Sequence, residues 1–153
     1  MLDRRISYSK DKSEIIRRLQ SADDSSGPFS LIADVLVFAA ALGLKRGSRV
    51  PLSEPLAEPI RQTVFDRQGY DTMMHLLAIQ ANPAPEAIAN SDEAVNARAS
   101  AFEEYANGGL AILQAELQGA VQVLDAVVLI VSSQRQEDRG SSGVFELSKL
   151  MLS

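Results

Sequence analysis

Apolar side chains recur every three or four residues along most of the chain, a spacing that predicts α-helices. The strongest example follows Ser91, which is placed to cap a long helix because its hydroxyl can accept a hydrogen bond from the first turn. Within this helix Gly108-Gly109 interrupts the pattern and predicts a kink, a close helix crossing or a helix end. The recurring apolar positions are Val95, Ala99, Phe102, Tyr105, Ala106, Leu110, Leu113 and Leu117.

Shorter helices are predicted elsewhere by the same spacing, separated by stretches rich in glycine, proline and small polar residues. Gly43 is well placed to end the second of them, because glycine adopts the left-handed conformation of a C-terminal cap. Residues 45–59 are predicted to be irregular, since three prolines remove backbone donors there. The predicted short helices are Asp11–Gln20, Leu31–Leu42, Ile60–Arg67, Asp71–Ala81 and Glu86–Ala89.

A further helix is predicted from Ala120 to Ser133, directly after Gly119. Its apolar run is broken only by Gln122 and Asp125. A membrane span needs about 20 predominantly apolar residues. The pattern therefore predicts a helix buried within the protein.

Together these elements predict an all-α fold, a single-domain helical bundle of six to seven helices. Arg4–Tyr8 alternates polar and apolar residues, which predicts a short N-terminal extended arm or strand. The helical domain is expected to cover residues 1–135. Residues 136–153 are expected to form a flexible linker followed by a C-terminal helix or tail, because a polar stretch precedes the apolar positions of Val144–Leu152.

The chain of 153 residues contains no cysteine, which excludes disulfides, thiolate zinc sites and cysteine nucleophiles. This composition fits the reducing cytoplasm, where we expect the protein to act without a membrane partner. The net charge is −5, but it is unevenly distributed. Residues 1–49 contain nine Lys/Arg and six Asp/Glu, a balance of +3, whereas residues 50–153 carry −8.

The basic N-terminal third suggests contact with DNA phosphates, which attract Lys and Arg. The predicted DNA contacts are Arg4, Arg5, Lys45, Arg46 and Arg49. An ordinary solvated helix face is the alternative interpretation.

Candidate chemistry is sparse. His75 is the single histidine, and Asp71 lies four residues before it on the same helical face. No nucleophile motif accompanies the pair, and a metal site would need further ligands. We therefore predict no catalytic residue, no metal and no cofactor, and a protein that is not an enzyme.

Several stretches have a distinctive order and spacing: Gly27–Phe29, Ala33–Leu36, Phe38–Gly43, Arg49–Leu52, Pro59–Arg61, Val64-Phe65, Gly69–Asp71 and Phe102–Leu110. In this order they resemble the Dnd system-associated protein 4 family, with Phe102–Leu110 (FEEYANGGL) as the most specific element. The resemblance covers residues 4–135 and leaves the tail outside it. Proteins of this family are encoded beside bacterial DNA phosphorothioation genes, which implies a context of defence against foreign DNA but no catalytic residues.

The resemblance directs attention to a polar face around the glycine pair. Its predicted recognition residues are Arg61, Glu103, Asn107, Gly108 and Gly109. Close packing of another helix on the glycines is the alternative.

The predicted function is that of a non-catalytic accessory protein of a Dnd-type anti-phage restriction system. It would bind other defence-system proteins, DNA, or both, and self-association through an apolar face is a further expectation. The alternatives are a stand-alone DNA-binding regulator that uses the basic N-terminal third, and an enzyme with an Arg/Glu/His polar pocket.

Overall fold

Residues 4–21, 27–55 and 59–135 are described by the structure, a computed structural model, and they contain six α-helices and no β-strand. The predicted all-α fold is therefore confirmed. The predicted linker and tail, residues 136–153, lie outside the described residues. The helices are α1 (Ser13–Leu19), α2 (Ile32–Lys45), α3 (Gln62–Arg67), α4 (Asp71–Ala81), α5 (Asp92–Glu116) and a helix of residues 123–135, and two 3₁₀ helices cover Lys10–Lys12 and Pro85–Ile88.

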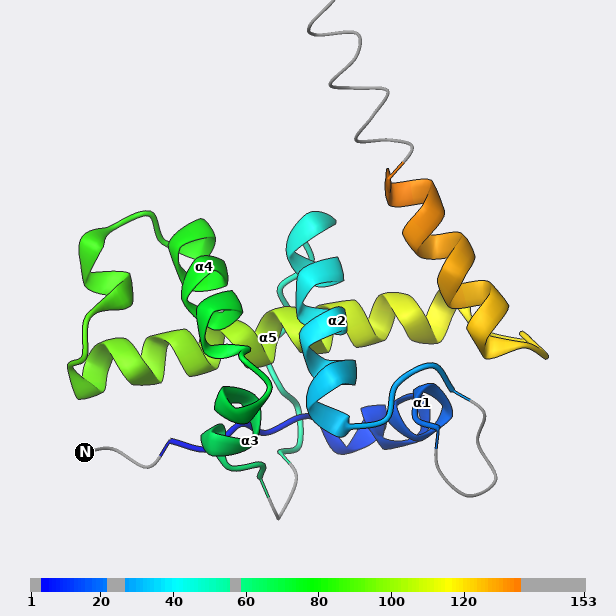
Figure 1. The fold of residues 1–153 in the computed structure, drawn as a ribbon, viewed down its shortest axis with the longest axis horizontal. Helices are drawn as coiled ribbons and strands as arrows, with labels where there is room; N and C mark the ends of the chain where they lie inside the picture. The colour runs from blue at the N-terminus through cyan, green and yellow to red at the C-terminus, as the bar shows by residue number, and fades with distance from the viewer. Residues whose placement is uncertain (1–3, 22–26, 56–58, 136–153) are drawn as a thin grey trace, which may run out of the picture.

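The helix α5 is the element on which the others pack. Its 25 residues extend about 37 Å, and it lies along the long axis of the molecule (Figure 1). The helix α2 crosses α5 and makes the most extensive contact with it, while α4 packs on α5 on the other side of that crossing from the 123–135 helix (Figure 1). Ser91 caps α5 as predicted, because its Oγ accepts a hydrogen bond from the Ala94 N–H at 3.2 Å.

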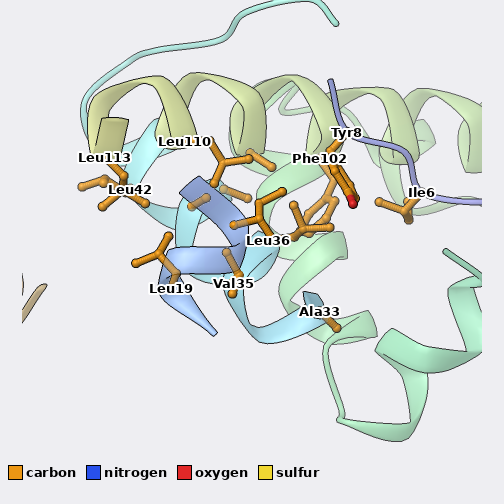
Figure 2. Close-up of a cluster of buried hydrophobic side chains, with 14 of the residues drawn as sticks. Ile6, Tyr8, Leu19, Ala33, Val35, Leu36, Leu42, Phe102, Leu110 and Leu113 are labelled. Carbon is orange, nitrogen blue, oxygen red and sulfur yellow. The ribbon is translucent and has the colours of Figure 1, made fainter. Parts of the chain in front are cut away.

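The core lies where α1, α2 and the N-terminal arm meet the apolar face of α5. Figure 2 shows this cluster, in which side chains of α2 and α5 interleave. Burial of these side chains removes apolar surface from water, the main favourable contribution to folding. The labelled members are Ile6, Tyr8, Leu19, Ala33, Val35, Leu36, Leu42, Phe102, Leu110 and Leu113.

The N-terminal arm is extended, as predicted. Ile6 pairs in antiparallel fashion with Ile60, through hydrogen bonds of 2.8 Å from the Ile6 N–H to the Ile60 C=O and 2.7 Å in the reverse direction. The Ile6 side chain is fully buried. The arm is therefore part of the domain's core.

The prediction that Gly43 ends the second helix is wrong. The helix α2 continues to Lys45, and the left-handed conformation occurs instead at Gly47, where φ is 64°. Gly43 is buried inside the helix against α5. A capping rule considers only the neighbouring sequence, whereas here the absence of a side chain serves a contact with a distant helix.

The prediction of a buried helix after Gly119 is also wrong in part. Residues 123–135 are helical, and Val127 and Ile130 are buried. However, Val121 is 93% exposed, Leu129 is 70% exposed and Val128 is 53% exposed. Among the described residues, the helix packs one apolar side on the protein and leaves another uncovered.

Candidate functional site

The glycine pair lies where α5 meets α2 at very short range. A Cβ atom on Gly109 would lie 1.7 Å from the backbone oxygen of Ala39, and one on Gly43 would lie 2.1 Å from that of Tyr105. Each helix thus places a glycine against a carbonyl of the other, an approach that a side chain would prevent. The helix α5 passes through Gly108-Gly109 without ending. Of the interpretations left open by the sequence, the close helix crossing is the one observed.

Asn107 and Gly108 hold the segment that follows α2. The Asn107 Nδ2 group donates hydrogen bonds to the carbonyls of Val50 and Pro51, at 3.2 and 3.1 Å. Gly108 lies so close to this segment that a Cβ would be 2.0 Å from the Ser48 carbonyl oxygen. Asn107 is only 3% exposed, and its Oδ1 atom has no hydrogen-bond partner among the described residues.

Arg49 is bound to the same stretch of α5. Its Nε atom lies 2.7 Å from an oxygen of Glu104, and its guanidinium group lies 5.5 Å from the centre of the Tyr105 ring. The second distance is within the range of a cation–π contact. Arg46 also forms an ion pair, with Glu116 near the end of α5. Arg46 and Arg49, two of the arginines predicted to contact DNA, therefore have carboxylate partners on α5.

Glu103 anchors the N-terminal arm. Its two oxygens face the guanidinium group of Arg4 at 2.8 and 3.2 Å, and one of them accepts a hydrogen bond of 2.6 Å from the Ser7 backbone N–H. The Glu103 side chain is 6% exposed and that of Arg4 is 25% exposed. A paired guanidinium and carboxylate of this geometry is among the stronger hydrogen-bonded arrangements in proteins.

The most specific motif of the resemblance thus has a structural account. Successive residues of FEEYANGG hold the arm through Glu103, residues 48–51 through Asn107 and Gly108, and α2 through Gly109. Direct contact of these residues with a partner stays a prediction.

The other residues predicted to bind DNA or a partner, and His75, lie outside the motif FEEYANGG. Arg61 is exposed at the start of α3, Lys45 is exposed at the end of α2, and Arg5 is half-buried in the arm. His75 contacts the backbone oxygen of Asp71 through Nδ1 at 2.7 Å, not the Asp71 carboxylate. The contact between the two residues therefore involves the backbone of Asp71 and not its carboxylate.

Asp66 lies close enough to His75 and Asp71 to be affected by both. Although Asp66 is exposed overall, partial burial of its carboxyl raises the pKa, the charge of Asp71 raises it further, and His75 opposes this change. Among the described residues, no group of three or more histidine, aspartate or glutamate side chains is arranged to bind a metal ion.

Arg98 is a buried residue that the sequence analysis missed. It is 6% exposed, and its Nη1 group donates to the carbonyls of Ala87 and Ala89 at 2.9 and 2.8 Å. Burial lowers the pKa of Arg98. Its burial could have been predicted from its position three residues after Val95, which places it on the apolar face of α5.

An apolar strip is exposed on the 123–135 helix. We define it as Leu124, Val128 and Val131, which are 49%, 53% and 39% exposed and occur at helical spacings of four and three. Val131 also lines a groove of about 190 Å³ between this helix and α2. Its lining includes the apolar residues Phe38, Leu42 and Ile130 and the basic residues Lys45 and Arg135.

A larger groove, of about 660 Å³, lies between α1 and the C-terminal half of α5. Glu14 and Arg18 line one side, and Gln114 and Gln118 line the other. None of the predicted site residues lines it. Within the described ranges, no helix has the length and apolar character needed to cross a membrane.

Comparison with known families confirms the resemblance. The model of the family described as DNA sulphur modification system-associated protein 4 matches residues 5–150, and the chain belongs to this family. The match extends fifteen residues past Arg135, so the expectation that the tail lies outside the family is wrong. No curated protein and no solved structure matches the chain.

Proposed function

We propose that this protein is a non-catalytic accessory component of a Dnd-type anti-phage defence system and that it binds another protein of that system through the apolar strip. Membership of a family associated with DNA sulphur modification systems supports the context. The observation that carries the binding role is the exposure of Leu124, Val128 and Val131 on one side of the 123–135 helix. Contiguous apolar side chains exposed on a surface are typical of protein interaction sites.

The proposal of a non-catalytic role is supported by the hydrogen bonds that Glu103 and Asn107 make within the protein. Both oxygens of Glu103 are engaged by Arg4, and one also by Ser7. Asn107 is bound to the backbone of residues 50 and 51. Groups held in this way stabilise the fold, and the one atom without a partner among the described residues, Asn107 Oδ1, is buried and inaccessible to a substrate.

Capture from a host that carries the phosphorothioation genes tests the proposal. The chain with Val128→Asp should lose a captured protein encoded in that gene cluster, as identified by mass spectrometry, because a carboxylate in the strip must be desolvated on binding. Leu76→Asp on α4 is the matched control, since Leu76 is 56% exposed and Val128 is 53% exposed. Equal capture by both variants would contradict the role of the strip.

Binding of duplex DNA is a second candidate, favoured by three exposed basic residues at and after the end of α2: Lys45, Arg46 and Arg49. The carboxylate partners of Arg46 and Arg49 do not exclude this, because exposed ion pairs contribute only about 0–1 kcal/mol and can exchange for phosphate contacts. We expect fluorescence anisotropy to show salt-sensitive binding that is lost with Lys45→Glu and Arg46→Glu and kept with Arg67→Glu. Absence of binding at low salt would exclude this candidate.

A further inference from the structure

The apolar strip and the groove beside it form one continuous surface. Val131 belongs to both, and Arg135 follows it by four residues, so that it lies on the same side of the helix. Arg135, the last residue that the structure describes, therefore lies at one end of this surface. The chain continues from there for 18 residues.

The sequence of that continuation is suited to the surface. Residues 136–143 are polar or glycine, and six of the nine residues from Val144 to Leu152 are apolar. If this segment is helical, Val144, Leu147 and Met151 share one side, while Glu146 and Lys149 lie away from it. The shared side is wholly apolar, which suits a groove lined by Phe38, Leu42 and Ile130.

The length of the tether favours docking within one chain. Eight residues span at most about 29 Å when extended, and the 123–135 helix is about 20 Å long. A tether as short as this gives an effective concentration in the millimolar range, well above that of a second molecule in dilute solution. The family match extends over residues 136–150 and so includes most of this stretch.

We propose that residues 144–152 dock on the apolar strip and groove of their own chain. The tail then covers, in the free protein, the surface on which the proposed partner binds, so a partner must displace it. This regulatory consequence rests on the proposed function, whereas the docking itself does not.

Disulfide trapping in the full chain tests the docking, and the absence of natural cysteines makes any introduced pair the only one present. The test variant is Val128→Cys with Leu147→Cys, and the control is Leu76→Cys with Leu147→Cys, in which the first position is equally exposed but lies on α4. Under mild oxidation at low protein concentration, we expect an intramolecular disulfide to form at least tenfold faster in the test variant, since a disulfide requires Cβ atoms about 4 Å apart. The products are distinguished by intact mass and by non-reducing electrophoresis.

Equal rates in the two variants, or a product of twice the mass in the test variant, would overturn the proposal. The second outcome would identify another copy of the chain as the occupant. A readout without cysteines compares Leu147→Gln with Lys149→Gln: binding of an apolar fluorescent dye should rise for the first and stay unchanged for the second, and equal dye binding by both would contradict the docking. The trapping experiment contains no other defence protein, so its failure is distinguishable from a failure of the capture experiment.

Discussion

Replacement of Gly109 by alanine tests whether α2 and α5 approach as closely as the structure shows. The added Cβ would lie 1.7 Å from the Ala39 carbonyl oxygen, whereas a carbon and a carbonyl oxygen in contact are about 3.3 Å apart. The two helices must therefore separate by roughly 1.6 Å. The obstructing atom is backbone, so no side-chain rotation can relieve the clash.

The magnitude follows from two opposing effects. Alanine is favoured over glycine inside a helix by about 1 kcal/mol. Against this, a gap of 0.5–1 Å already removes about a quarter to a half of the dispersion energy of each contact, and overpacking a core costs about 1–3 kcal/mol or more. Because α2 and α5 form the most extensive contact among helices α1–α5, we expect a cost at or above the upper end of this range, about 3–5 kcal/mol, and therefore a net loss of about 2–4 kcal/mol.

Urea denaturation followed by circular dichroism at 222 nm measures this loss. For a domain of this size the same change should lower Tm by about 4–16 °C. Asn96→Ala is the control, because Asn96 is exposed on α5 and gains helix propensity without a clash. If Gly109→Ala is as stable as the wild type, or more stable, the close crossing does not exist and the argument for the glycine pair fails.

Two further predictions concern charged side chains. Glu103→Gln should cost about 1–3 kcal/mol of unfolding free energy, because Arg4 loses its buried carboxylate partner. The control Glu104→Gln should cost less than about 1 kcal/mol, because its partner Arg49 is exposed. Equal losses in urea denaturation would contradict the anchoring role of Glu103. Burial raises the pKa of Asp66, so the folded state binds its proton more tightly than the unfolded chain and ionisation lowers stability. Asp66→Asn should therefore be more stable than the wild type at pH 7, and this difference in stability should vanish below pH 3.8, the ordinary pKa of aspartate. Urea denaturation from pH 3 to 7 measures the difference, and the same difference at every pH would refute the prediction.

The helices could be predicted from the sequence because their signals are local. The periodic apolar positions of α5 and the Ser91 cap were visible directly, and both are observed. Local rules failed where a distant contact decides the role of a residue. Gly43 was expected to end a helix, and it lies within one because the backbone of α5 passes against it.

The candidate site was harder to predict for the same reason. The partners of Glu103 and Asn107 lie between 56 and 99 residues away in the chain, and no spacing rule connects them. The exposure of the 123–135 helix could not be predicted either, because its sequence is apolar on most sides. In the structure, α2 packs against only one of these sides. What the sequence did provide was the choice of residues: the motif FEEYANGG holds the arm, residues 48–51 and α2.

The dependence of the arm and of α2 on α5 has a consequence for synthesis on the ribosome. Arg4 and its partner Glu103 are separated by 99 residues, and elongation proceeds at about 5–20 residues per second. The apolar helix α2 therefore emerges several seconds before the surface that covers it. During this interval its side chains are available to chaperones, and folding can be completed only after α5 has left the exit tunnel.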